Sequence, residues 1–146
     1  MVDVQTEIEI ARPVRQVAEF AQEPSNAPRW YVNIRSVEWL TTPPVCVGSR
    51  VAFIAQFLGR RLAYTYEVQE LVPLERLVMR TAQGPFPMET IYTWSPVDEG
   101  RTRMTLRNRG QPSGFARITA LLLAGAMRRA NAKDLARLKQ VLEGTG

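Results

Sequence analysis

The sequence predicts an α+β fold in which a curved antiparallel sheet of six to seven strands wraps around a long C-terminal helix. Three observations predict it. Apolar and polar residues alternate along residues 2–10 and along several later segments, which is typical of half-buried strands. Turn-forming residues separate those segments. Apolar residues at helical spacing dominate one long segment, residues 115–144.

The N-terminal part of the chain is expected to form one strand and two short helices. Residues 2–10 alternate between apolar and polar side chains, as an antiparallel strand with one buried face does. Pro13 is well placed to open a short helix over residues 13–21, because a first helical turn does not need the missing N–H. The segment "EPSNAPRW" (23–30) interrupts this helix, and a second short helical turn should contain Trp30 and Tyr31.

The middle of the chain predicts a strand over residues 34–41 and a hairpin built from residues 49–58 and 60–71. Gly59 and Arg60 would form its two-residue turn, with glycine first. The two tyrosines of the second strand then share its apolar face, and each hydroxyl needs a partner or water. The register places Tyr64 opposite Ala55, Tyr66 opposite Phe53 and Val68 opposite Val51.

Three further strands are expected over residues 75–82, 89–97 and 101–109. A three-residue loop, Asp98–Gly100, would join the last two, with its glycine in the left-handed conformation. This hairpin places Trp94 opposite Met104 and Tyr92 opposite Leu106. Its other face should be solvated and contains Arg101, Arg103, Thr105, Arg107 and Arg109.

The long helix over residues 115–144 would cover the sheet with an apolar stripe and end at Gly144. Because a sheet of six or seven strands curls strongly and one helix is only about 10 Å wide, a cavity should remain between them. A mostly apolar cavity with a few hydroxyls is typical of a small-molecule site. The stripe consists of Phe115, Ile118, Leu122, Ala126, Met127, Leu135, Leu138 and Leu142.

Composition limits the chemistry more than it identifies the function. The 146 residues fit one domain, 1–146, with no histidine and one cysteine, Cys46. A zinc site and Ser-His or Cys-His pairs are therefore not expected, and no metal or other cofactor is predicted.

The lone cysteine and the absence of a secretory signal predict a cytoplasmic protein. The net charge of +5 comes from 17 Arg and 2 Lys without a basic arm, so no nucleic-acid partner is predicted.

Several short segments, together with the element order, resemble a known family. The segments are "RW" at 29–30, "VGSR" at 47–50, "YEVQELVPLERLVMR" at 66–80 and "WSPVDEGRTRMTLR" at 94–107. They resemble the polyketide cyclase/dehydrase and lipid-transport family, part of the SRPBCC superfamily of START-like, birch-pollen-allergen-like helix-grip proteins. The resemblance covers essentially the whole chain. It implies a helix-grip fold whose cavity binds sterols, lipids, polyketides or other hydrophobic molecules.

The candidate ligand-binding residues are those that the expected registers place on the inner face, with plain core packing as the alternative for each. Trp30, near the mouth, and Trp39 are added as aromatic residues beside the cavity. Arg80 could bind a carboxylate or phosphate of the ligand if its side chain points inward, and an outward Arg80 is the alternative. The remaining candidates are Phe53, Tyr64, Tyr66, Tyr92, Trp94, Met104, Leu106, Ile118, Leu122 and Met127.

Three functions stay open, of which a carrier or sensor of a small hydrophobic ligand is favoured. The second is a cyclase, dehydratase or aromatase that uses the same cavity. It has no identified catalytic residue, because Glu67 and Glu89 are expected on the outer face and Glu70, on the inner face, lies near solvent at a strand end. The third is a peripheral membrane protein that handles lipids through its basic surfaces. A monomer and a homodimer paired through an edge strand both fit the sequence.

Overall fold

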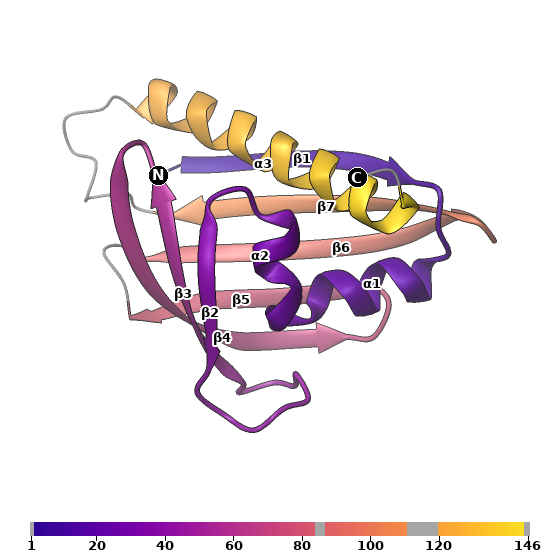
Figure 1. Cartoon of the computed structure of the whole chain (residues 1–146), viewed down its shortest axis with the longest axis horizontal. Helices are drawn as coiled ribbons and strands as arrows, with labels where there is room; N and C mark the ends of the chain where they lie inside the picture. The colour runs from indigo at the N-terminus through magenta and orange to yellow at the C-terminus, as the bar shows by residue number, and fades with distance from the viewer. Residues whose placement is uncertain (1, 84–86, 111–119, 145–146) are drawn as a thin grey trace.

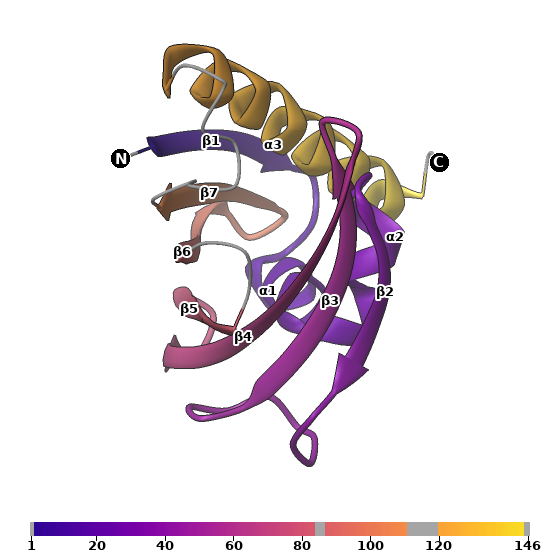
Figure 2. The ribbon, with the colours of Figure 1, turned by 90° about the vertical axis from the view of Figure 1, so that its left-hand side faces the viewer.

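Seven antiparallel strands form one curved sheet within residues 2–83, 87–110 and 120–144, which are those that the computed structural model describes. The strand order is β1-β7-β6-β5-β4-β3-β2, so β1 and β2 are the edges. Figure 2 shows the sheet curving around the helices. The strands are β1 Val2–Ile10, β2 Ile34–Trp39, β3 Arg50–Phe57, β4 Arg60–Val72, β5 Arg76–Gln83, β6 Met88–Asp98 and β7 Arg101–Gly110.

The helices lie against the concave side of this sheet (Figure 1, Figure 2). The long helix α3, Ala120–Glu143, packs along β1 and touches α2. Gly144 follows it with a φ of +74°, as a helix stop does. The short elements are α1 Val14–Gln22, η1 Pro24–Asn26 and α2 Ala27–Trp30. The predicted α+β helix-grip fold is confirmed.

The β3–β4 hairpin turns one residue earlier than predicted. Leu58 and Gly59 form the turn with φ values of 52° and 76°, and Phe57 pairs with Arg60. A two-residue turn with positive φ at both positions matches the twist of the strands, and glycine at the second position suits it. Tyr64 therefore lies opposite Phe53 instead of Ala55, and Tyr66 opposite Val51 instead of Phe53. A shift of two residues keeps every side chain on its expected face.

A β-bulge between Val68 and Glu70 gives Glu70 the opposite orientation from the one predicted. Val68 pairs with Met79, but Glu70 pairs with Val78, so one extra residue is inserted in β4. The extra residue reverses the alternation. Glu70 consequently faces outward, where its carboxylate accepts from Arg76 at 2.7 Å.

The β6–β7 hairpin has the predicted register, with Trp94 opposite Met104 and Tyr92 opposite Leu106. Its loop differs from the prediction. Asp98 pairs with Arg101 after an irregularity at residues 96–98, and the φ of Gly100 is not positive. The Asp98 carboxylate accepts from the Gly100 N–H at 2.9 Å, which holds the turn without a left-handed residue.

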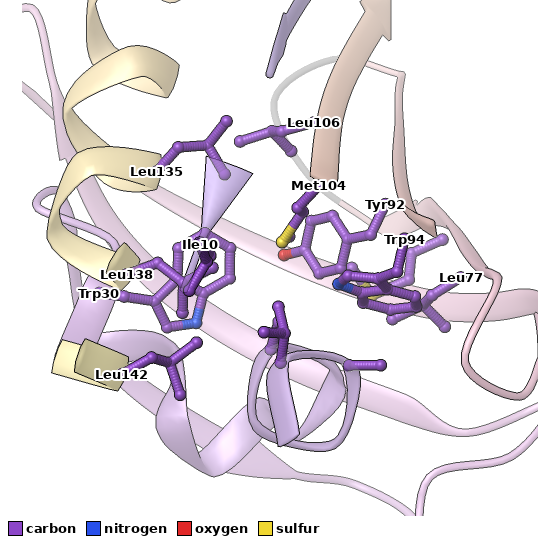
Figure 3. Close-up of a cluster of buried hydrophobic side chains, with 14 of the residues drawn as sticks. Ile10, Trp30, Leu77, Tyr92, Trp94, Met104, Leu106, Leu135, Leu138 and Leu142 are labelled. Atoms are coloured by element: carbon purple, nitrogen blue, oxygen red, sulfur yellow. The ribbon is translucent and has the colours of Figure 1, made fainter. Parts of the chain in front are cut away.

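A dry core fills one part of the concave face. Figure 3 shows it, with the leucines of α3 on one side and Tyr92 and Trp94 of the sheet on the other. The short helices α1 and α2 contribute buried side chains to the same cluster, so little space remains there. Its members include Ile10, Val17, Trp30, Leu77, Trp94, Met104, Leu106, Leu135, Leu138 and Leu142.

Candidate functional site

A cavity of about 150 Å³ lies between the N-terminal half of α3 and the sheet, beside the dry core. Strands β3, β4 and β6 supply most of its wall, and the Tyr31–Ile34 segment closes one side. The predicted residues that line it are Phe53, Tyr64, Tyr66, Tyr92 and Met127. The sheet residues are neighbours, since the Phe53 and Tyr66 ring centroids are 5.8 Å apart and those of Tyr64 and Tyr66 are 6.0 Å apart.

Four predicted residues lie in the dry core instead of on the cavity wall. Trp30 is fully buried and lies away from any mouth, with its ring centroid 4.1 Å from that of Tyr31. Trp94, Met104 and Leu106 are on the expected inner face, but they belong to the buried cluster that includes residues of α1 and α2. The sequence predicted the long C-terminal helix as the cover of the sheet, whereas α1 and α2 also pack into this part of the groove.

Three other predicted residues lie on the periphery. Trp39 is half-buried on edge strand β2, where its indole N–H donates to Ser25 Oγ at 3.1 Å. Arg80 points outward because the strand alternates and its neighbour Met79 faces the cavity. Leu122 is 67% exposed. Ile118 lies outside the described residues, as does Phe115.

The buried face of α3 is displaced by one residue from the predicted stripe at its N-terminal end. Steps of four residues back from Leu135, which is buried as predicted, reach Asn131, Met127 and Leu123. Leu123 is 2% exposed and lines the cavity. Leu122 lies about 100° around the helix from it and faces solvent. Because residues 121–123 are all leucine, the sequence left open which of them is buried. Counting back from the leucines later in the helix identifies Leu123.

Several arginines on the outer face of the sheet form ion pairs. Arg80 Nε and Arg109 Nη2 donate to opposite oxygens of Glu89 at 2.7 Å and 2.6 Å. Arg107 Nη2 donates to Asp3 at 2.6 Å. The arginines of this face therefore include ion-paired side chains, whereas the sequence predicted solvated ones. Glu89 lies on the outer face as predicted. Arg80 pairs with it there, so both side chains are on the opposite side of the sheet from the cavity.

The cavity wall also carries a connected set of polar side chains. The Thr90 hydroxyl donates to Asn108 Oδ1 at 2.7 Å and lies 3.3 Å from the Tyr66 hydroxyl. Asn108 Nδ2 in turn donates to Asn131 Oδ1 at 3.2 Å. These contacts join β4, β6, β7 and α3 across the cavity wall.

A second polar group on the wall joins α3 to the segment after α2. Asp134 accepts a hydrogen bond from the Val32 N–H at 2.9 Å and is 3% exposed. The hydroxyls of Tyr31 and Tyr92 lie 2.5 Å apart. Asn131 and Asp134 are three residues apart and therefore share one face of α3.

Burial sets the protonation of these groups. It raises the pKa of Asp134 to about 7, against the opposing effects of the Val32 N–H and the Arg137 charge. Burial also raises the pKa of Tyr66 to about 12, and the pKa values of Tyr31 and Tyr92 rise for the same reason. Near neutral pH the phenols therefore stay protonated, whereas the carboxyl of Asp134 can hold or release a proton.

Four polar residues of the wall were not predicted from the sequence: Asn131, Asp134, Asn108 and Thr90. A signal for the first two was present, because both fall on the apolar face of α3 between Met127 and Leu138. Polar residues at such positions are seldom buried unless they find partners or serve a site. Thr90 and Asn108 also gave a signal, because the β6–β7 register predicted from the sequence already places them opposite each other on the inner face.

Within the described part of the chain, no group of three or more Cys, Asp or Glu side chains is placed to hold a metal ion. Among the described helices, none is long and apolar enough to cross a lipid bilayer.

Comparisons with known proteins agree on the architecture. A family model described as polyketide cyclase / dehydrase and lipid transport matches residues 1–143. A START superfamily protein from Mycobacterium smegmatis is similar with a TM-score of 0.84 at 13% sequence identity, over 99% of each chain. A protein from Thermus thermophilus reaches a TM-score of 0.81 at 18% identity, over 99% of each chain. The Zhui aromatase/cyclase from a Streptomyces species reaches 0.78 at 18% identity, over 97% of this chain and 93% of that one. No curated protein matches the sequence significantly.

Proposed function

The chain belongs to the polyketide cyclase / dehydrase and lipid transport family, and on that premise we propose that it binds a small, largely apolar molecule in the cavity under α3, as a carrier or sensor. The observation that carries the proposal is the cavity itself. Its wall is mostly aliphatic and aromatic, with a few hydroxyl, amide and carboxyl groups. This combination buries an apolar body and orients it through few polar contacts.

The size of the cavity narrows the ligand class. Its volume is about 150 Å³, and apolar cavities of about that volume bind benzene-sized molecules. We therefore infer a ligand with the bulk of one substituted ring, which is smaller than a sterol or a long-chain lipid.

Two tryptophan substitutions on neighbouring residues test this proposal. Leu123→Trp adds an indole to a side chain that lines the cavity, whereas Leu122→Trp adds the same indole to an exposed position. Calorimetric titration with toluene should show binding to the wild type and to Leu122→Trp. Binding to Leu123→Trp should be weaker by at least about tenfold, because the added ring occupies the space.

Circular dichroism melts of both variants check that the fold is retained. Absence of toluene binding to the wild type would contradict the proposed site, as would equal binding to both folded variants.

A cyclase- or dehydratase-type reaction on the bound molecule is the second candidate, and Asp134 is the observation that favours it. A cavity carboxyl with a pKa of about 7 can accept and return a proton near neutral pH. The Tyr31 and Tyr92 hydroxyls on the same wall could donate to a developing oxyanion. Asp134→Asn should abolish turnover of a polyketide-like substrate while retaining toluene binding. Unchanged turnover in that variant would show that Asp134 takes no part in the reaction.

A further inference from the structure

Asn131 carries a buried amide donor beside the cavity. The residue is 5% exposed and lines the wall. Its Nδ2 atom is buried and has no hydrogen-bond partner among the described residues. A buried donor without a partner is costly, so natural proteins retain few of them, and those on a cavity wall are candidates for contact with a ligand.

The neighbouring side chains fix which end of the Asn131 amide is left without a partner. The Thr90 hydroxyl donates to Asn108 Oδ1, which leaves Asn108 Nδ2 to donate to Asn131 Oδ1. Because the Asn131 oxygen is engaged in this way, the amide offers its NH₂ group to a ligand. An amide NH₂ only donates, so the matching ligand atom must be an acceptor.

Charge on the wall restricts the acceptor to a neutral one. No Lys or Arg is among the described residues that line the cavity. Asp134 lies on the same face of α3 one turn away, and its carboxylate would repel an anion above neutral pH. A carboxylate or phosphate would therefore be buried without a counter-charge, which is strongly unfavourable.

We propose that the ligand is a neutral, ring-sized carbonyl compound whose oxygen accepts a hydrogen bond from Asn131 Nδ2. This inference rests on the proposed ligand-binding function and specifies the chemical class that the cavity selects. Thr90 and Asn108 act as positioning residues, since they hold the amide in the donating orientation without touching the ligand oxygen.

Two probes of similar shape test the inference. Acetophenone carries a carbonyl oxygen and ethylbenzene does not. Calorimetry gives a dissociation constant for each, and their ratio is compared between the wild type and the variants. The difference in hydration between the probes is the same for every protein, so a change in the ratio reports the contact with the protein.

Asn131→Asp keeps an oxygen for Asn108 to donate to and removes the NH₂ group, and Asn131→Leu removes both polar atoms. The preference for acetophenone should fall on the order of tenfold in each. Asn26→Asp makes the same change in an asparagine that does not line the cavity, whose Nδ2 donates to the Phe20 carbonyl, and should leave the ratio within about twofold. Circular dichroism shows whether each Asn131 variant folds. If one of them does not, the other still tests the inference.

A nuclear magnetic resonance measurement on the wild type needs no variant. The side-chain NH₂ signals of Asn131 should move downfield with acetophenone and much less with ethylbenzene. An unchanged probe ratio in the folded Asn131 variants, with both probes still bound, overturns this inference and leaves the proposed function standing. Failure of the wild type to bind either probe overturns both.

Discussion

Replacement of Asp134 by asparagine should remove a pH-dependent loss of stability. The pKa of this buried carboxyl is raised from 3.8 to about 7 in the folded protein. Between those values the folded state keeps a proton that the unfolded chain has released, so the free energy of unfolding falls as pH rises. A shift of about 3 pH units at 1.36 kcal/mol each gives a loss of at most about 4 kcal/mol, complete above pH 7.

Asparagine is neutral at every pH and keeps an oxygen that can accept from the Val32 N–H. The variant and the wild type should therefore have similar stability near pH 4, and the variant should become more stable by up to about 4 kcal/mol at pH 8. Urea unfolding followed by the fluorescence of the buried Trp30 and Trp94 measures this difference. The other titrating groups contribute equally to the pH dependence of both proteins, so their contributions cancel in the difference.

Asp3→Asn is a control of opposite sign. The Arg107 guanidinium that donates to Asp3 lowers the pKa of that carboxyl, so its contribution is present above the unfolded pKa and is lost as pH falls through the folded pKa. This variant should be less stable than the wild type at neutral pH, with a smaller difference in acid. A stability difference for Asp134→Asn that stays constant from pH 4 to 8 would refute the reasoning.

Two further substitutions test the outer face and the β3–β4 turn. Glu89→Gln should lower the free energy of unfolding by about 1 kcal/mol at low salt and by less in 1 M salt, because the partly exposed Arg80 and Arg109 lose a shared counter-charge; equal losses at both salt concentrations would contradict this. Gly59→Ala should destabilise the protein by about 1 kcal/mol, because Gly59 has a φ of 76°. Gly100→Ala, at a residue without positive φ, should cost less, and the reverse order would contradict the assignment of the turn.

The sheet and its inner face could be predicted because alternation of side chains is a local property of a strand. The β6–β7 register followed from it correctly. The β3–β4 register did not, because pairings that differ by two residues put the same side chains on the same face. The bulge that turns Glu70 outward left no mark in the alternation.

The division of the concave face into a dry core and a cavity could not be predicted. It depends on where α1 and α2 pack, and so Trp94 and Met104 are buried in the core while Tyr66 lines the cavity. The polar side of the cavity depends on the phase of α3, which places Asn131 and Asp134 inward. The positions of those two residues on an apolar helical face indicated it, as did the predicted pairing of Thr90 with Asn108.

The most direct test of the account locates a bound probe by isotope-filtered nuclear Overhauser effects between toluene and the methyl groups of the protein. We expect contacts with Leu62, Leu123 and Met127, whose side chains line the cavity. Contacts confined to the exposed Leu121 and Leu122, or none at saturating toluene, would contradict the central claim that this chain is built around a ligand-binding cavity.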